Sequence, residues 1–231
     1  MELIWEGLYE AFRLITSFDG LVLGAALRSL WISSLAVALA TLAGLPLGTI
    51  LARIAFPGRR MVVVIFRGCM AIPTVFVGIV CYATFSRKGV LGTLELVYTP
   101  WAIVVGEFLL AVPIIVSITH GAIKALDHRV GETVLTLGAP VLRRWRTYVS
   151  EARVGVTLGV LTAFARCVTE LGIAMIVGGN IKGRTRTLAT ATALETSKGD
   201  FDRGLAMGII LMIIALLVTI VIVSISHEER Q

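Results

Sequence analysis

The sequence contains little charge. Only 16% of its 231 residues are Asp, Glu, Lys or Arg, whereas 57% are hydrophobic and the mean hydropathy is +0.90. Soluble domains carry about 25% charged residues, so this composition excludes a soluble domain. Two windows, residues 29–52 and 204–226, contain no charged residue at all. Each can cross the ~30 Å hydrocarbon core of a bilayer as a helix, which predicts an integral, multi-pass helical membrane protein.

Cysteine and histidine are also scarce, and motifs for catalysis are missing. The dispersed Cys69, Cys81 and Cys167 predict neither a disulfide framework nor a metal site. The histidines at 120, 128 and 227 form no pair on one helical face, so no metal and no cofactor is expected. No phosphate-binding GxxxxGK[ST] motif and no nucleophile elbow occur. The chain is therefore predicted not to be an enzyme, and ATP that drives it would be hydrolysed by a partner subunit.

Three further spans contain few charges: residues 61–85 with Arg67, residues 100–123 with Glu107, and residues 154–178 with Arg166 and Glu170. With the two charge-free windows they predict five transmembrane helices, in a single transmembrane domain over residues 1–231. Internal prolines predict kinks in a packed bundle, and glycine pairs at four-residue spacing predict close helix contacts. The prolines are Pro46, Pro73 and Pro113, and the pairs are Gly44 with Gly48, Gly155 with Gly159, and Gly204 with Gly208.

Residues 1–19 form a separate amphipathic pattern. Its acidic residues differ from the basic start of a secretory signal. We expect a helix lying in the membrane interface, and the sequence leaves open whether it is partly inserted. The acidic positions are Glu2, Glu6 and Glu10, and the apolar ones are Trp5, Leu8, Phe12 and Ile15.

Basic residues decide the orientation only weakly. Ten lie on the side of residues 124–153, counting Arg230, and nine lie on the other side. Five of those nine fall within residues 180–203. If these five serve a function there, the positive-inside rule predicts that residues 124–153 face the cytoplasm. The net charge is +6, but the sequence contains no basic stripe with interleaved aromatic residues, so binding to nucleic acid is not expected.

The segment 124–153 predicts two short helices with a bend between them. Gly138 is the residue type expected after a helix end, and Pro140 suits a new helix start. This shape suits a socket on another protein, although a helix lying on anionic headgroups has the same pattern. The apolar face of the second helix is Val141, Leu142, Trp145, Tyr148 and Val149.

Two stretches resemble a known family. Residues 132–139, ETVLTLGA, resemble the EAA loop of ABC transporter permeases, in which Gly follows Glu by six residues, although Thr133 and Val134 replace the two alanines. Residues 161–201 resemble the oxyanion permeases for molybdate, tungstate and sulfate. Within them, residues 178–201, GGNIKGRTRTLATATALETSKGDF, are most similar to tungstate permeases. The resemblance covers residues 129–205 well and the first hundred residues by span pattern alone.

The resemblance implies an all-α membrane protein with the type I ABC importer permease fold, in the prokaryotic plasma (inner) membrane. It implies a homodimer embedded in membrane lipid, working with two ATP-binding cassette subunits and an extracytoplasmic substrate-binding protein. It also implies a loop that docks into the ATPase subunit and transmits its closure, through Glu132, Thr133, Gly138 and Ala139. The implied substrate is an oxyanion, tungstate first. Alternatives are a molybdate or sulfate ABC permease, a proton-coupled secondary transporter and a non-transporting scaffold.

Charged residues inside the spans are candidates for the translocation path. Arg166 and Glu170 are four residues apart, so they share one helical face and can pair. Glu107 and Arg67 offer a second potential pair between helices. These residues either border the path or only hold the bundle together, and the sequence leaves both possibilities open.

The segment after residue 177 predicts an outer mouth that attracts anions. A helix that ends at Gly178 and Gly179 exposes backbone groups, which is tolerable in a membrane where they line a cavity or meet a partner. The cations Lys182, Arg184 and Arg186 follow, with threonines at 185, 187, 190 and 192 as neutral hydrogen-bond donors. A solvated basic loop is the alternative. The candidate residues are Gly178, Gly179, Asn180, Arg184, Thr185, Arg186 and Thr187.

Overall fold

The computed structural model describes the backbone of residues 2–17 and 19–228, and the side chains of this part except at 2, 3, 15, 135 and 221–228. The predicted roles of Arg230 and of the Ile15 and His227 side chains lie outside these described residues. The described chain is helical and contains no strand. Its helices are α1 (Glu2–Thr16), α2 (Gly20–Arg53), α3 (Arg59–Cys69), α4 (Thr74–Phe85), η1 (Gly92–Leu94), α5 (Pro100–Lys124), α6 (His128–Thr136), α7 (Val141–Glu151), α8 (Arg153–Val168), α9 (Gly172–Gly178), α10 (Leu188–Ser197) and α11 (Phe201–Glu228).

Three of the described helices are long and apolar enough to cross a membrane: α2, α5 and α11. Two bent pairs, α3 with α4 and α8 with α9, bring the number to five if each pair is one span. The span pattern therefore agrees with the sequence prediction, with two differences. Helix α2 begins nine residues before the charge-free window, where Asp19 Oδ1 accepts hydrogen bonds from the backbone N–H groups of Leu21 and Val22. The other difference is the sharpness of the bends.

The two bent spans are broken rather than kinked. Helices α3 and α4 meet at 99°, and Pro73 is the N-cap of α4, because its ring prevents the preceding helix from continuing. Helices α8 and α9 meet at 54° with no proline at the break. By contrast, Pro46 and Pro113 lie inside uninterrupted helices. Of the three prolines, therefore, only Pro73 lies at a break between two helices.

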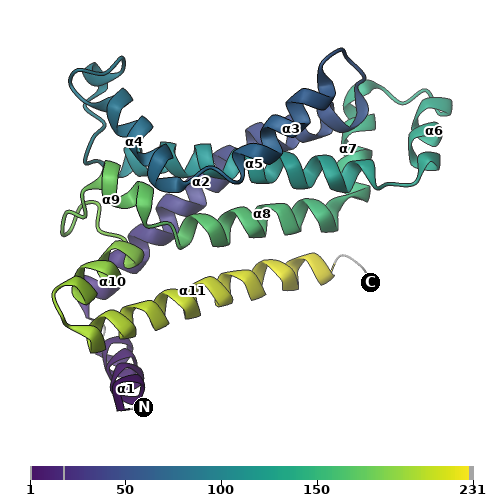
Figure 1. Ribbon diagram of the computed structural model, residues 1–231. Helices are drawn as coiled ribbons and strands as arrows, with labels where there is room; N and C mark the ends of the chain where they lie inside the picture. The colour runs from purple at the N-terminus through teal and green to yellow at the C-terminus, as the bar shows by residue number, and fades with distance from the viewer. Residues whose placement is uncertain (1, 18, 229–231) are drawn as a thin grey trace.

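Helix α5 is the centre of the bundle and packs along α2 and α8 (Figure 1). The predicted glycine pairs allow this close approach. A Cβ at Gly48 would lie 2.8 Å from the Cβ of Thr119, and a Cβ at Gly155 would lie 2.5 Å from that of Ala122. Close backbone contact and dense van der Waals packing hold membrane helices together, because lipid supplies no hydrophobic driving force between them.

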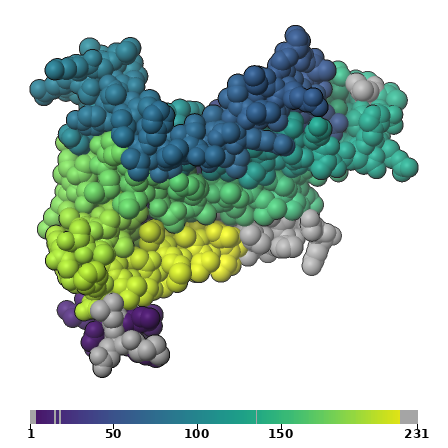
Figure 2. Space-filling view, in the orientation of Figure 1, coloured from purple at the N-terminus to yellow at the C-terminus, as the bar shows by residue number. Residues whose placement is uncertain are grey.

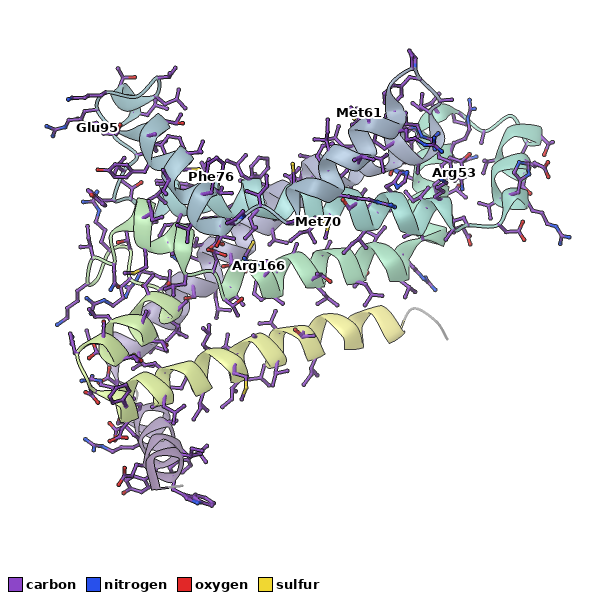
Figure 3. All side chains as sticks on the ribbon, viewed as in Figure 1. Arg53, Met61, Met70, Phe76, Glu95 and Arg166 are labelled. Carbon is purple, nitrogen blue, oxygen red and sulfur yellow. The ribbon has the colours of Figure 1, made fainter. Side chains whose placement is uncertain are left out.

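The loops gather at two ends of the bundle (Figure 1). The start of α3, the end of α5, and helices α6 and α7 lie at one end, which we call the inner end. The segment 86–99, the end of α9, and α10 lie at the other, which we call the outer end. Between them the space-filling view shows a concave face over α3 and α4 (Figure 2). Met61, Met70 and Phe76 stand along α3 and α4 and are exposed (Figure 3).

Helix α1 packs against the start of α11 through small residues. Gly7, Ala11 and Leu14 are buried, and a Cβ on Gly7 would lie 2.5 Å from Leu205. Trp5 and Phe12 are each 68% exposed. Helix α1 therefore presents an apolar face away from the bundle, which suits the predicted position at the membrane interface.

Candidate functional site

The segment 124–153 folds as predicted, as two helices joined by a tight bend. Helix α6 is followed by Gly138, whose φ of 62° lies in the left-handed region that favours glycine. The N–H of Ala139 then donates to the carbonyl of Val134 at 3.2 Å, which closes the bend. Helix α7 begins directly after Pro140. We call residues 124–153 the coupling elbow.

The coupling elbow is anchored on one face and free on the other. Val134, Tyr148 and Ala152 are buried with Ile123, the penultimate residue of α5. In contrast, Leu137, Val141 and Leu142 are 77%, 61% and 68% exposed. An apolar patch of this kind at the tip of a bend is typical of a protein–protein contact. The exposed side is where a partner can bind.

Glu132 and Thr133 lie on α6, at the open side of the elbow. Glu132 Oε1 lies 3.2 Å from His128 Nδ1, and both side chains are largely exposed. The hydroxyl of Thr133 donates to the carbonyl of Arg129, one turn earlier. An exposed pair of this kind adds little stability, so the Glu132 carboxylate remains accessible to a partner.

Arg53, which the sequence analysis counted only as a loop charge, holds the elbow in place. Its guanidinium lies over the ring of Tyr148, 4.2 Å from the ring centroid. Its Nη2 donates to the carbonyl of Ile123 at 3.2 Å. Figure 3 shows Arg53 at the junction of α2, α5 and α7. No local sequence pattern points to this role, because the contacts join positions 70 or more residues apart.

The predicted pair of Arg166 and Glu170 is present at the break between α8 and α9. Figure 3 labels Arg166 at this break. Arg166 Nη1 donates to Glu170 Oε2 at 2.8 Å, and Glu170 Oε1 accepts from the N–H of Ile173 at 3.1 Å. The Glu170 side chain is 1% exposed, whereas that of Arg166 is 43% exposed. The carboxylate therefore bridges the two half-helices, satisfying a free N–H at the start of α9 while pairing with a cation at the end of α8.

The predicted pairing of Arg67 with Glu107 is wrong. No ion pair joins them among the described residues: Arg67 is exposed on α3, while Glu107 is 2% exposed in the core. Glu107 instead lies beside α8, where Cys167 Sγ donates to its backbone carbonyl at 3.6 Å. Its Oε2 has no hydrogen-bond partner in the described part of the chain. Arg67 instead lines a cavity with His120 and Lys124, near the end of α5, whereas Glu107 belongs to the first half of that helix.

At the outer end, α9 ends at Gly178 as predicted. Gly179 follows with a φ of 68° and Asn180 with a φ of 50°. A Cβ on Gly179 would lie 2.6 Å from the ring of Tyr98, so both the backbone angle and the close approach require glycine. The N–H of Tyr98 also donates to the carbonyl of Val177 at 2.8 Å. The exposed backbone that the sequence predicted is thus partly satisfied by the segment 86–99.

The prediction that the threonines are free donors for anions is wrong. Thr185 is buried and donates its hydroxyl to the carbonyl of Gly178 at 2.6 Å. Thr187 and Thr190 form a capping box that starts α10, which the sequence analysis did not expect as a helix. Thr192 donates to the carbonyl of Leu188. Each hydroxyl has one proton to donate, and each proton is used inside the fold.

The arginines of this segment play different parts. Arg186 is half-buried and donates through Nε to Asn180 Oδ1 at 3.1 Å and through Nη2 to the Asn180 carbonyl at 3.3 Å. Its own carbonyl accepts from Arg28 Nε at 2.8 Å, which ties the segment to α2. Arg184 and Lys182 are exposed, and their side chains form no hydrogen bond or ion pair within the described chain. Among the described residues 178–187, these two side chains are the ones that offer free charge to an anion.

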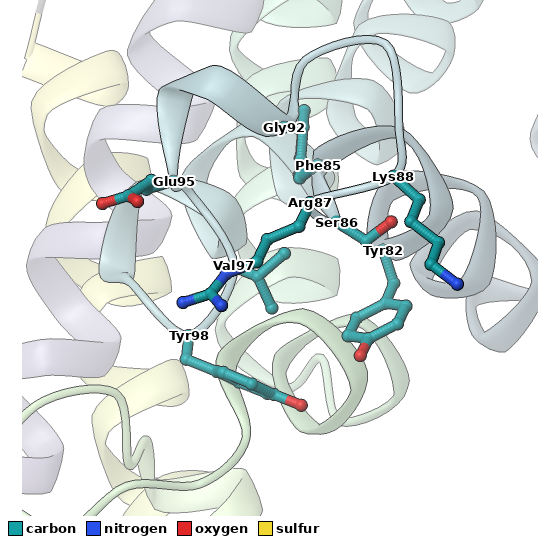
Figure 4. A pocket seen from close by; sticks show the side chains of 9 residues that line it. All are labelled: Tyr82, Phe85, Ser86, Arg87, Lys88, Gly92, Glu95, Val97 and Tyr98. Atoms are coloured by element: carbon teal, nitrogen blue, oxygen red, sulfur yellow. The ribbon is translucent and has the colours of Figure 1, made fainter.

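A pocket of about 570 Å³ lies next to this segment, at the end of α4 (Figure 4). Arg87 and Lys88 line it together with the rings of Tyr82 and Tyr98, and Glu95 lies at its edge. Hydrogen bonding with Tyr82 raises the pKa of the Tyr98 phenol above its ordinary value. Sequence reasoning counted Arg87 and Lys88 as loop charges and missed both tyrosines, because aromatic residues at span ends are ordinary.

The three predicted regions are not one site. The coupling elbow lies at the inner end, the Arg166–Glu170 pair lies within the bundle, and residues 178–187 lie at the outer end (Figure 1). The three regions are therefore spread from one end of the bundle to the other and are not gathered in one cleft.

Known proteins share both the sequence and the fold. The family model described as "Binding-protein-dependent transport system inner membrane component" matches residues 44–228. The tungstate uptake system permease protein TupB of Peptoclostridium acidaminophilum is 35% identical, over 99% of this chain and all of the relative. The molybdenum transport system permease protein ModB of Escherichia coli K12 is 29% identical, over 89% of this chain and 95% of the relative. A chain of the MetNI methionine ABC transporter superposes with a TM-score of 0.75 at 19% identity, covering 92% of this chain and 97% of that one.

Proposed function

The chain belongs to the family of binding-protein-dependent transport system inner membrane components, and from this premise we propose that it is the permease of a tungstate importer. At the level of the family, it is a multi-pass inner-membrane protein and the permease component of an ABC importer, with the type I importer fold. This membership contradicts the alternatives of a secondary transporter and a scaffold. Its relatives are transport permeases rather than enzymes.

One observation carries the assignment of the substrate. Identity with the tungstate permease extends over 99% of the chain at 35%, whereas the molybdenum permease reaches 29% over 89%. A tetrahedral dianion also suits the free cations of Lys182, Arg184, Arg87 and Lys88 at the outer end. Molybdate and sulfate remain the weaker alternatives.

The proposed transporter is a homodimer of single-domain permeases with two ATP-binding subunits and an external binding protein. A second copy would cover the concave face over α3 and α4 and place the path on a two-fold axis (Figure 2). Exposed apolar side chains on this face support such a contact, among them Val64, Ile65, Val75 and Phe76.

ATP hydrolysis in the partner subunits would reach the path through the coupling elbow. The exposed Leu137, Val141 and Leu142 would enter a socket on the ATPase, with Glu132 and Thr133 at its edge. Arg53 would pass the movement on to α2 and α5, because it contacts both Tyr148 and the carbonyl of Ile123. Gly138 and Ala139 would set the angle of the bend.

Uptake by the reconstituted transporter tests this proposal. The permease, its ATPase and its binding protein would be placed in proteoliposomes, with tungstate, molybdate and sulfate supplied separately. We expect ATP-dependent accumulation of tungstate at lower concentrations than the other two anions require. An ATPase partner without its phosphate-binding lysine provides the control. Preferential uptake of sulfate or molybdate would show that tungstate is not the main substrate. Uptake without ATP would reject the coupling of transport to ATP hydrolysis.

A further inference from the structure

A basic basin of about 670 Å³ lies at the inner end, between α3 and the last turns of α5. Its polar lining consists of Arg59, Arg60, Arg67, His120 and Lys124, with no carboxylate among the residues that line it. We call this cavity the inner basin. Neither the coupling elbow nor the outer end uses it, and Lys124 is the one residue that it shares with the elbow.

The four cations of the inner basin are unpaired. None of them forms an ion pair within 4.0 Å in the part of the chain that the structure describes. Like charges gathered around one cavity repel one another, and the low-dielectric walls of a cleft concentrate their field. A bound anion would replace this repulsion by attraction. The charge pattern therefore favours a negatively charged ligand.

His120 provides a second, independent observation. The side chain lines the inner basin and the residue is only 4% exposed, yet neither ring nitrogen has a hydrogen-bond partner among the described residues. Buried polar atoms in native proteins are nearly always hydrogen-bonded to protein, water or an ion. A neutral imidazole offers one N–H donor. This ring can therefore donate to an acceptor that occupies the basin.

We propose that the inner basin binds a tetrahedral oxyanion group at the cytoplasmic end of the permease. Guanidinium forks match two oxygens of such a group, an ammonium adds a point charge, and the imidazole N–H adds a third kind of donor. The group comes either from the transported oxyanion as it leaves the path or from the phosphate of an anionic lipid. The first source rests on the proposed function, and the second does not.

The position of the basin gives such binding a consequence. Lys124 ends α5 and begins the coupling elbow, and Arg59 begins α3. An oxyanion held by both residues joins α3 to the base of the elbow.

Binding to the purified full-length chain tests the proposal without ATP, ATPase or binding protein. The chain would be placed in phosphatidylcholine nanodiscs, and binding of labelled tungstate would be measured by equilibrium dialysis. Tungstate that binds at the outer end is common to all variants and therefore does not affect their comparison. Arg60→Gln with Arg67→Gln removes two cations of the basin. Arg143→Gln with Arg146→Gln removes two exposed cations of α7 at the same end and is the matched control. Because no transport is measured, failure here is distinct from failure of the proposed function.

We expect the basin variant to bind tungstate at least about tenfold more weakly at one class of sites, which is the effect of losing a charge-assisted hydrogen bond. The affinity of the control should stay within about twofold of the unmodified chain. If a lipid supplies the group, tungstate binding is equal in all variants, and retention of labelled phosphatidylglycerol falls in the basin variant alone. Equal retention of both ligands by the basin variant and the control overturns the proposal. The same result is expected if a second copy of the chain fills the basin. Arg59→Gln with Lys124→Gln repeats the test should the first variant fail to fold by circular dichroism.

Discussion

The guanidinium carbon of Arg53, the last residue of α2, lies 4.2 Å from the centroid of the Tyr148 ring on α7. The same guanidinium donates to the carbonyl of Ile123, close to the end of α5. One side chain thus connects two spans to the coupling elbow. A cation over an aromatic ring contributes about 0.5–2 kcal/mol, and a hydrogen bond from a charged donor about 1.5–3 kcal/mol.

Replacing Arg53 by Gln should therefore loosen the elbow without unfolding the bundle. We expect the local opening free energy of residues 124–153 to fall by roughly 1–3 kcal/mol, because the contact with Tyr148 and the charged hydrogen bond are both lost. Hydrogen exchange would then quicken about five- to 150-fold in α7 but not in α2. Arg146→Gln, an exposed arginine of α7, is the control. Unchanged exchange in α7 would contradict the anchoring role of Arg53.

Gly138→Val should uncouple transport from ATP hydrolysis. No heavy atom of the described residues, the two chain neighbours of Gly138 apart, lies within 4 Å of a Cβ added at this position, so we expect the effect to come from the backbone φ of 62°. The left-handed conformation costs a branched residue about 1–2 kcal/mol. Gly138→Asn should retain most of the activity, since asparagine tolerates this region. Substrate-stimulated ATPase activity of the assembled transporter distinguishes them, and equal activity of both variants would reject the assigned role of the bend.

The ion pair between Arg166 and Glu170 should behave as a unit. Arg166→Gln leaves a buried carboxylate without its cation, and we expect a loss of roughly 1–3 kcal/mol, discounted because Arg166 is 43% exposed at its side chain. Adding Glu170→Gln should recover part of this loss, because the amide oxygen can still accept from the Ile173 N–H. Thermal unfolding in detergent measures both effects. A double variant less stable than Arg166→Gln would show that the charge of Glu170 is needed for another reason.

The two arginines of the outer segment should differ in their response to salt. Arg184 is exposed and free of partners in the described chain, so Arg184→Gln should slow uptake at low salt and much less at high salt, where the Debye length is short. Arg186 bonds Asn180 twice, so Arg186→Gln should cause a deficit that persists in salt. Initial rates of tungstate uptake in proteoliposomes, with saturating ATP, separate them. A wild-type rate for Arg184→Gln at both salt concentrations would remove this charge from the mechanism.

The orientation of the chain can be tested with single cysteines. In a background without Cys69, Cys81 and Cys167, cysteines placed at Arg143 and Lys198 should react from opposite sides with an impermeant thiol reagent. Both positions are exposed, so access is not limited by burial. Labelling of both from the outside would reject a cytoplasmic elbow and the five-span interpretation with it.

The sequence by itself determined the class of protein, the number of candidate spans and the bend of the elbow. These properties depend on local signals: long apolar windows, a glycine at a helix end and a proline at a helix start. Membrane helices satisfy their own backbone hydrogen bonds, so a span can be recognised without knowing its neighbours. The pair of Arg166 and Glu170 was predictable from its four-residue spacing, and it forms although α8 ends between the two residues, at Val168.

Only the tertiary structure decided which charges meet and which hydroxyls are free. Arg67 lines a cavity with His120 and forms no ion pair with Glu107 among the described residues. The 99° bend between α3 and α4 was also unpredictable, because a proline in the sequence does not reveal the size of its bend. Pro46 and Pro113 produced no break, since α2 and α5 continue through them. The threonines after residue 184 were read as donors for anions, but Thr185 bonds the backbone of Gly178, and Thr187 starts a helix. A side chain's partners depend on contacts between distant segments, and a linear pattern carries no record of those contacts.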